Sequence, residues 1–216
     1  MKEYRQARFA RPPGATEIVL VRHGETRAAT ADDPFPRVMG HGDPELHEEG
    51  RRQAEHVGAR LRGAPVGAIY VTNLRRTLET ATPLARHLGL EPIAEPGLRE
   101  VLMGEWEGAI MRKKTQEQDP LYLRVLAEER WDLIPGAESH AVVNARVMPA
   151  LSRIHQRHPD QLVVAVLHGA IIGHVLAHAA GSRPFAFMGA DNGSISHIVM
   201  RGESIILRGY NDTAHL

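Results

Sequence analysis

Apolar residues in this chain of 216 residues fall in short continuous runs, separated by stretches in which they recur at helical spacing. The continuous runs at residues 17–21, 68–71 and 161–167 predict strands buried on both faces. Weaker patterns predict strands at 91–94, 194–200 and 204–208, and helical spacing predicts helices at 48–62, 74–88, 141–158 and 170–180. This alternation indicates an α/β fold, a three-layer sandwich whose mostly parallel central sheet has helices on both faces.

The predicted helix at 74–88 carries the clearest local signals. Thr72 and Asn73 are typical of residues that cap a helix N-terminus, and Gly89 is typical of a C-cap. Pro83 is expected to kink or divide the helix, because proline has no backbone N–H to donate. The predicted apolar face consists of Leu74, Leu78, Ala81, Ala85 and Leu88.

The remaining segments indicate how the chain is organised. Residues 1–15 are basic and lack an apolar core, which predicts a flexible tail rather than a signal peptide. Residues 16–216 are expected to form a single domain without repeats or a linker. Within this domain, residues 27–42 predict a loop, and the irregular stretch at about 100–140 predicts a mostly helical insertion over one end of the sheet and the active site.

Composition narrows the classes of function. Lys and Arg number 26, as do Asp and Glu, and the resulting formal net charge of zero argues against a nucleic-acid-binding protein. The absence of cysteine excludes disulfides, thiol nucleophiles and cysteine zinc sites. Histidines and glycines interrupt the most apolar segment, residues 162–180, so no membrane partner is expected. These features favour a cytoplasmic protein, and they leave the oligomeric state open, a homodimer included.

Candidate chemistry lies where two predicted strands end in His-Gly, at His23-Gly24 and at His168-Gly169. Ligands of open α/β sheets bind at the carboxyl ends of the strands, so these histidines are expected to share a site. Arg22 precedes the first of them, and the guanidinium group suits a phosphate ester through paired hydrogen bonds.

Arg75 and Arg76 begin the helix after the strand at 68–71 and are further candidates for binding phosphate. Neighbouring residues on a helix point about 100° apart, since a turn contains 3.6 residues. One of these arginines is therefore expected to face the pocket while the other is solvated or paired.

Taken in order, these segments resemble the signatures of the histidine phosphatase superfamily, the phosphoglycerate-mutase-like family, over roughly residues 17–216. The matching segments are Arg22-His23-Gly24-Glu25-Thr26, Thr72 to Ala81, Leu98-Arg99-Glu100 with Gly104 to Gly108, Pro135 to Ser139, Leu167-His168-Gly169 and Tyr210 to Leu216. The resemblance implies the phosphoglycerate-mutase-like fold.

The resemblance also implies a phosphoric monoester hydrolase that acts on a small phosphomonoester without metal or cofactor. His23 would attack phosphorus to form a phosphohistidine, and Glu100 would protonate the leaving group and then activate water. The implied catalytic residues are His23, Glu100, His168, Arg22 and Arg76; phosphate would be bound by Arg22, Arg76, His168 and Gly169, with Gly24, Glu25 and Thr26 in support.

The chain departs from the family pattern near both histidines. Relatives often have Trp-Asn shortly after the first motif, where this chain has Arg27-Ala28-Ala29, and the loop that follows, as far as Met39, looks lengthened. Leu167 stands where a serine frequently precedes the second His-Gly. These differences leave the physiological substrate unassigned.

Alternative functions follow from the same resemblance. A cofactor-dependent phosphoglycerate mutase is the main one, although a mutase must exclude water and commonly has a longer covering insertion. A relative that binds phosphorylated ligands without catalysis is the next. A protein phosphohistidine phosphatase is disfavoured because such relatives tend to lack the covering insertion.

Several other residues invite a functional interpretation that the sequence disfavours. His174 and His178 have the i, i+4 spacing of helical zinc ligands, but no Glu follows His174, so a packed or surface pair is expected. His41 is interpreted as a loop residue, although it could line the pocket mouth. Trp106 and Trp131 are expected to serve packing.

Overall fold

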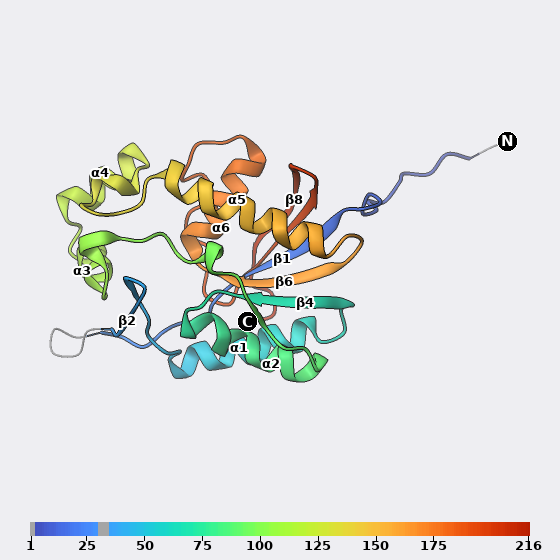
Figure 1. Cartoon of the computed structure of the whole chain (residues 1–216), viewed down its shortest axis with the longest axis horizontal. Helices are drawn as coiled ribbons and strands as arrows, with labels where there is room; N and C mark the ends of the chain where they lie inside the picture. The colour runs from blue at the N-terminus through green and yellow to red at the C-terminus, as the bar shows by residue number, and fades with distance from the viewer. Residues whose placement is uncertain (1–2, 30–34) are drawn as a thin grey trace.

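The computed structural model describes residues 3–29 and 35–216. Its centre is a six-stranded sheet with the strand order β5-β4-β6-β1-β7-β8 (Figure 1). The strands are β1 (Thr16–Arg22), β4 (Val66–Val71), β5 (Ile93–Ala94), β6 (Leu162–Leu167), β7 (Ile195–Arg201) and β8 (Ser204–Asp212). β5, β4, β6 and β1 pair in parallel, whereas β7 pairs antiparallel with both β1 and β8. The mostly parallel sheet predicted from the sequence is therefore confirmed.

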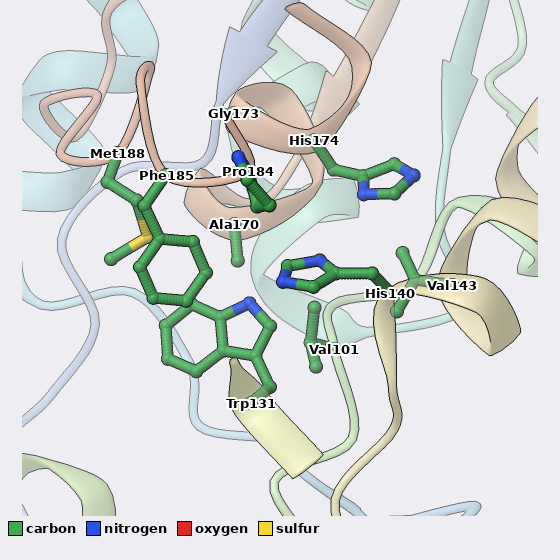
Figure 2. Close-up of a pocket in the computed structure, with 10 residues that line it drawn as sticks. All are labelled: Val101, Trp131, His140, Val143, Ala170, Gly173, His174, Pro184, Phe185 and Met188. Carbon is green, nitrogen blue, oxygen red and sulfur yellow. The ribbon is translucent and has the colours of Figure 1, made fainter. Parts of the chain in front are cut away.

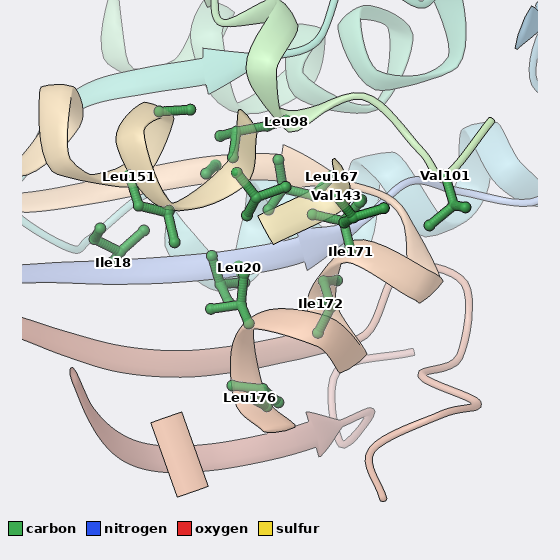
Figure 3. Packing of buried hydrophobic residues seen from close by; sticks show 14 of the residues in the cluster. Ile18, Leu20, Leu98, Val101, Val143, Leu151, Leu167, Ile171, Ile172 and Leu176 are labelled. Carbon is green, nitrogen blue, oxygen red and sulfur yellow. The ribbon is translucent and has the colours of Figure 1, made fainter. Parts of the chain in front are cut away.

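Helices cover both faces of the sheet (Figure 1). α1 (Glu48–Leu61) and α2 (Arg75–Leu88) pack on one face, and α5 (His140–Arg157) and α6 (Gly169–Ala180) pack on the other. Successive residues of a strand point to opposite faces, so Ile18 and Leu20 of β1 join the core beneath α5 and α6, shown in Figure 3, while Val19 and Val21 join the core beneath α1 and α2. The two cores join the sheet to a layer of helices on each face, which gives a three-layer sandwich.

α2 departs from its prediction in several details. Its N-cap is Leu74, whose side chain makes no capping bond, because Thr72 and Thr77 turn inward and bond each other instead. The helix runs through Pro83 without a break, and Gly58 of α1 leaves the space that the proline ring needs. Leu78 is 49% exposed, outside the buried face. Gly89 ends the helix with φ of 65°, as predicted.

The segment at 100–140 consists of short helices at one end of the sheet, in agreement with the predicted insertion. It contains η2 (Gly104–Trp106), α3 (Ile110–Gln116), α4 (Pro120–Glu128) and η3 (Trp131–Leu133). Trp106 and Trp131 are buried, which supports a packing role. Another short helix, η1 (Pro96–Leu98), precedes the segment.

The prediction of a loop throughout residues 27–42 is wrong at its C-terminal end, where β2 (Arg37–Val38) and β3 (His41–Gly42) form a small hairpin. Its residues 30–34 lie outside the described part of the chain. The hairpin was not foreseen because strands of two residues have too short a pattern to detect.

Residues 3–12 form neither helix nor strand and extend away from the sheet (Figure 1). Regular structure begins with β1 at Thr16. Within residues 3–29 and 35–216, none of the helices combines the length and apolar character that a membrane span needs.

Candidate active site

Strand register brings the two His-Gly segments together. β1 and β6 are parallel neighbours with Arg22 opposite Leu167, so His23 and His168 leave adjacent strands at the same level. The backbone N–H of His23 donates to the carbonyl of Leu167 at 3.0 Å, and the two imidazole centroids lie 5.3 Å apart. The shared site expected from the sequence is therefore present at the carboxyl edge of the sheet.

Glycine is required immediately after His23. A Cβ atom at Gly24 would lie 2.4 Å from the carbonyl oxygen of Gly50, so a side chain would push the turn away from α1. The backbone N–H of Gly24 donates to Oγ1 of Thr80 at 3.0 Å, which ties the turn to α2 as well. The turn that presents His23 is thus held by both helices on that face.

The ring of His23 is held in one tautomer. Its Nδ1 lies 2.8 Å from the carbonyl oxygen of Gly24. Since a carbonyl oxygen only accepts hydrogen bonds, Nδ1 carries the proton and Nε2 has a free lone pair. Burial, together with Arg76 and Arg22, holds the pKa of His23 well below its usual range, so the ring is neutral at neutral pH. Asn192 donates to the backbone carbonyl of His23 at 2.8 Å and fixes the strand end.

Arg22 and Arg76 supply buried positive charge to the pocket. A guanidinium N–H of Arg22 donates to the carbonyl of Ala190, and Arg76 donates to the carbonyl of Gly42 at 2.8 Å. Burial lowers the pKa of both groups, but arginine remains protonated at physiological pH. Arg75 points outward and pairs with Glu79, so Arg76 is the one of the two that faces the pocket, as expected.

His168 and Gly169 lie next to the pocket but are not among the residues that line it. His168 is fully buried, and its Nε2 lies 3.1 Å from the hydroxyl of Thr72. Gly169 begins α6, and a Cβ there would lie 3.3 Å from Nε of Arg22. This close approach lets the arginine pass over the start of the helix.

Glu100 lines the same pocket as His23. Its carboxylate oxygens face the backbone N–H groups of Val101 at 3.0 Å and Ala170 at 3.4 Å. Burial raises the pKa of Glu100 above its usual range, although these N–H groups and Arg76 oppose the shift. A carboxyl group with a raised pKa can donate a proton near neutral pH, as a general acid must.

Arg146 of α5 holds the segment that carries Glu100. Its guanidinium donates to the backbone carbonyls of Gly97 at 3.0 Å, Arg99 at 2.7 Å and Glu100 at 2.9 Å. The same group forms a bidentate ion pair with Glu138, at 2.8 and 2.7 Å. This ring of charge-assisted bonds fixes an otherwise irregular backbone.

Of the three residues expected to support phosphate binding, Gly24, Glu25 and Thr26, only one lines the pocket. Thr26 lines the pocket. Gly24 shapes the turn but does not line the pocket, and Glu25 is exposed with its backbone N–H bonded to Gln53.

Arg112 of α3 is a pocket residue that the sequence analysis missed. It donates to the hydroxyl of Thr26 and, at 2.9 Å, to the carbonyl of Arg27, and its guanidinium lies 4.8 Å from the ring centroid of Phe35. Burial lowers the pKa of Arg112. The sequence Met111-Arg112-Lys113-Lys114 signals a basic helix, but nothing in it indicates which cation turns inward.

The pocket as a whole has a volume of about 250 Å³. Its wall also includes His41, whose Nε2 lies 3.0 Å from the carbonyl of Glu100, and Trp106, so both residues do more than the loop and packing roles expected of them. Glu107 lines it too, but its carboxylate accepts bonds from the backbone N–H groups of Gly42 and Met103. Three guanidinium groups, those of Arg22, Arg76 and Arg112, therefore face a small space beside a neutral imidazole.

A second, much smaller cavity lies between α5 and α6, with a volume of about 10 Å³ (Figure 2). His140 and His174 stack beside it with centroids 6.1 Å apart, and Trp131 packs on Phe185. Burial lowers the pKa of His174 to about 4. Among the described residues, no group of three or more His, Asp or Glu is arranged to hold a metal ion.

The sequence is similar to those of two proteins named as phosphoserine phosphatases. Phosphoserine phosphatase 1 of Hydrogenobacter thermophilus is 31% identical over 203 residues, covering 93% of this chain and 94% of that protein. The metal-independent phosphoserine phosphatase of Arabidopsis thaliana is 29% identical over 208 residues, covering 93% of this chain and 83% of that protein.

The fold also matches a solved structure. The crystal structure of phosphoglycerate mutase from Bacillus anthracis str. Sterne superposes with a TM-score of 0.78 at 20% identity, over 94% of this chain and 96% of that one. A family model described as the histidine phosphatase superfamily (branch 1) matches residues 18–213, from the third residue of β1 to the residue after β8. The chain therefore belongs to the histidine phosphatase superfamily.

Proposed function

We propose that this protein is a metal-independent phosphatase that hydrolyses a small phosphomonoester through a phosphohistidine on His23. The observation that carries the proposal is the state of that imidazole. Its Nδ1 proton is committed to the carbonyl of Gly24, which leaves the Nε2 lone pair free beside Arg22 and Arg76. A neutral, oriented nucleophile next to fixed positive charge is what attack on a phosphate dianion requires.

In the first step, Nε2 of His23 attacks phosphorus and the ester P–O bond breaks. The electron pair of that bond stays on the leaving oxygen, which takes the proton of Glu100. Arg22, Arg76 and His168 stabilise the equatorial oxygens as negative charge shifts across the phosphoryl group. The products are an alcohol, a phosphohistidine and an ionised Glu100.

In the second step, the ionised Glu100 removes a proton from water as the water oxygen attacks phosphorus. The P–N bond breaks and its electron pair returns to Nε2, so free phosphate leaves and both His23 and Glu100 recover their starting states. The raised pKa of Glu100 suits both steps, because one group must act first as acid and then as base.

Phosphoserine is the substrate that we propose within this class. Two relatives are named as phosphoserine phosphatases, and Arg112 offers a cation at the pocket mouth for a carboxylate near the ester. Arginine binds carboxylates through paired hydrogen bonds, which gives the contact direction as well as charge. The pocket volume of about 250 Å³ suits a small molecule rather than a folded protein.

A phosphoglycerate mutase is the second candidate, supported by the overall similarity to a mutase structure. A mutase returns the phosphoryl group to a reoriented intermediate and must keep water out. α3, which borders the pocket through Arg112, has no fully buried residue, and we take this as favouring hydrolysis over a mutase reaction that must exclude water.

The deciding experiment offers the purified protein phosphoserine and 3-phosphoglycerate separately. Release of inorganic phosphate and serine supports the proposal, whereas formation of 2-phosphoglycerate without phosphate release supports the mutase. Binding of phosphate esters without turnover would support a non-catalytic relative. We also propose a cytoplasmic location, which the absence of cysteine favours because disulfides are typical of secreted domains.

A further inference from the structure

His168 carries a nitrogen that the described structure leaves without a partner. The residue is fully buried, and Nε2 is bonded to Thr72, but Nδ1 contacts no donor or acceptor in residues 3–29 and 35–216. Buried polar atoms in proteins are nearly always paired. An exception beside His23, whose ring centroid lies 5.3 Å away, points to a ligand as the missing partner.

A relay of two threonines determines where the proton on His168 lies. The hydroxyl of Thr77 donates to the backbone carbonyl of Leu74 at 2.8 Å, which uses its only hydrogen. Oγ1 of Thr72 lies 3.0 Å from Oγ1 of Thr77, so Thr72 must donate in that contact. The hydroxyl of Thr72 has then no hydrogen left for His168, and Nε2 of His168 must donate to it.

The relay therefore selects the Nε2–H tautomer and leaves a bare lone pair on Nδ1 while the ring is neutral. The charged and titratable groups facing His168 are Arg22 at the end of β1, His23 directly after it, His41 from β3 and Arg76 from α2, with Glu100 bonded to the start of α6. Burial and Arg76 hold the pKa of His168 well below its usual range, so the ring is neutral at neutral pH when no anion is bound.

A tetrahedral dianion changes this balance. Its oxygens only accept hydrogen bonds, so they repel a bare lone pair and attract an N–H group. Two added negative charges also favour the charged form of a nearby imidazole. We propose that the site takes up one proton, from solvent to Nδ1 of His168, when a tetrahedral dianion binds, and that Thr72 and Thr77 are the positioning residues that impose this coupling.

This inference rests on the proposed function only in requiring that the site binds a phosphate-like dianion. Sulfate is the probe, because it remains a dianion throughout the working pH range and any proton taken up must go to the protein. Calorimetric titrations of the intact protein in buffers of different ionisation enthalpy give the number of protons bound. The expected uptake is about one per sulfate, and the sulfate Kd should rise about tenfold per pH unit above neutrality by linkage.

Variants separate the relay from the rest of the site. In Thr72→Val a neutral His168 can place its proton on Nδ1 and bond sulfate directly, so uptake and the pH dependence of Kd should fall towards zero. Thr72→Ser should retain both. Thr82→Val, which removes an exposed hydroxyl from α2, the helix that carries Thr77, is the matched control and should behave as the parent protein.

Nitrogen-15 spectra of the histidine rings assign the proton. The expected signature is a neutral Nε2–H ring for His168 in the free protein and a doubly protonated ring with sulfate. Glu100→Gln should keep the pH dependence of the sulfate Kd. That result would show that the carboxyl group of Glu100 is not the proton acceptor.

Each alternative outcome is decisive. Sulfate binding without proton uptake, an Nδ1–H tautomer in the free protein, or loss of the pH dependence in Glu100→Gln overturns the inference while the phosphatase proposal stands. Absence of any sulfate binding overturns both.

Discussion

The carboxyl edge of the sheet and the segment at 100–140 contribute to one pocket in different ways. At the edge, His23 and His168 follow strands buried on both faces, and the β1–β6 register fixes their relative position. In the other segment, Arg112 stands on α3, none of whose residues is buried. The chemical groups at the edge thus extend from strands of the buried core, whereas Arg112 extends from a helix without fully buried residues.

This contrast indicates that the carboxyl edge of the sheet carries out phosphoryl transfer, whereas the segment at 100–140 selects the substrate. Phosphoryl transfer needs the nucleophile and its charged partners held in one geometry, which a packed sheet provides. Recognition of the rest of the substrate is served by residues on connecting segments, which vary more readily among relatives. Glu100 lies at the boundary of the two regions, and Arg146 ties it to α5.

Replacing the nucleophile should have the largest effect. His23→Ala removes the proposed nucleophile, and turnover should fall on the order of 10⁴-fold or more, as for other covalent nucleophiles. Phosphate release from phosphoserine measures it. The control His87→Ala removes an exposed histidine and should retain full activity. More than a few per cent of activity in His23→Ala would refute the assigned nucleophile.

Replacing the acid should have the next largest effect. Glu100→Gln should lower kcat for phosphoserine by about 10²–10⁴-fold, because both proton transfers are lost. Since the pKa of Glu100 is raised, the parent rate should fall as pH rises through that pKa, and since the pKa of His23 is lowered, activity should persist below pH of about 6.5.

The variant should lose the alkaline decline and release a burst of nitrophenol from p-nitrophenyl phosphate, whose leaving group needs no proton. Glu105→Gln, at an exposed site in the same segment, is the control. An unchanged pH profile in Glu100→Gln would assign the acid elsewhere.

Removing one guanidinium group from the carboxyl edge of the sheet should lower activity less than replacing His23 or Glu100. Arg76→Ala should lower kcat/KM about 10²–10³-fold for every phosphate ester, because the lost contact is to the transferred group itself. Arg75→Ala, its neighbour on the outer side of α2, should change activity little. Equal losses in the two variants, measured with phosphoserine and p-nitrophenyl phosphate, would contradict the placement of Arg76.

Replacing Arg112 should have a smaller effect, and one that is limited to phosphoserine. Arg112→Ala should raise KM for phosphoserine by roughly tenfold, the value of a charged hydrogen bond of about 1.5 kcal/mol, and should leave p-nitrophenyl phosphate nearly unaffected. Lys113→Ala, with an exposed side chain, serves as control. A uniform loss for both substrates would place Arg112 in the chemistry rather than in selection.

Chelation should have no effect. Because the arginines supply the positive charge that a metal would otherwise provide, EDTA should leave the rate with phosphoserine unchanged. Loss of activity that is restored by an added divalent cation would contradict the metal-independent mechanism.

The same contrast explains what could be predicted from sequence. Strands such as 17–21 and 161–167 are marked by continuous apolar runs, so the edge and the convergence of His23 with His168 follow from pattern and topology. The proton position on His23 depends on the carbonyl of Gly24, which no side-chain pattern encodes.

Predictions failed where tertiary contacts override local signals. Pro83 does not divide α2, which runs on to Leu88 while the proline packs closely against Gly58 of α1. Arg112 was missed because α3 has basic residues on several sides, and only the packed structure shows that this one meets Thr26 and Phe35.

The central claim is that the phosphoryl group passes through His23, and trapping it tests the claim most directly. The protein is mixed with phosphorus-32-labelled phosphoserine, quenched in alkali within the first turnover, digested and analysed by mass spectrometry. The account predicts an acid-labile, alkali-stable label on the peptide containing His23, absent in His23→Ala and more persistent in Glu100→Gln. Label on another residue, or turnover with no labelled protein at any quench time, would contradict it.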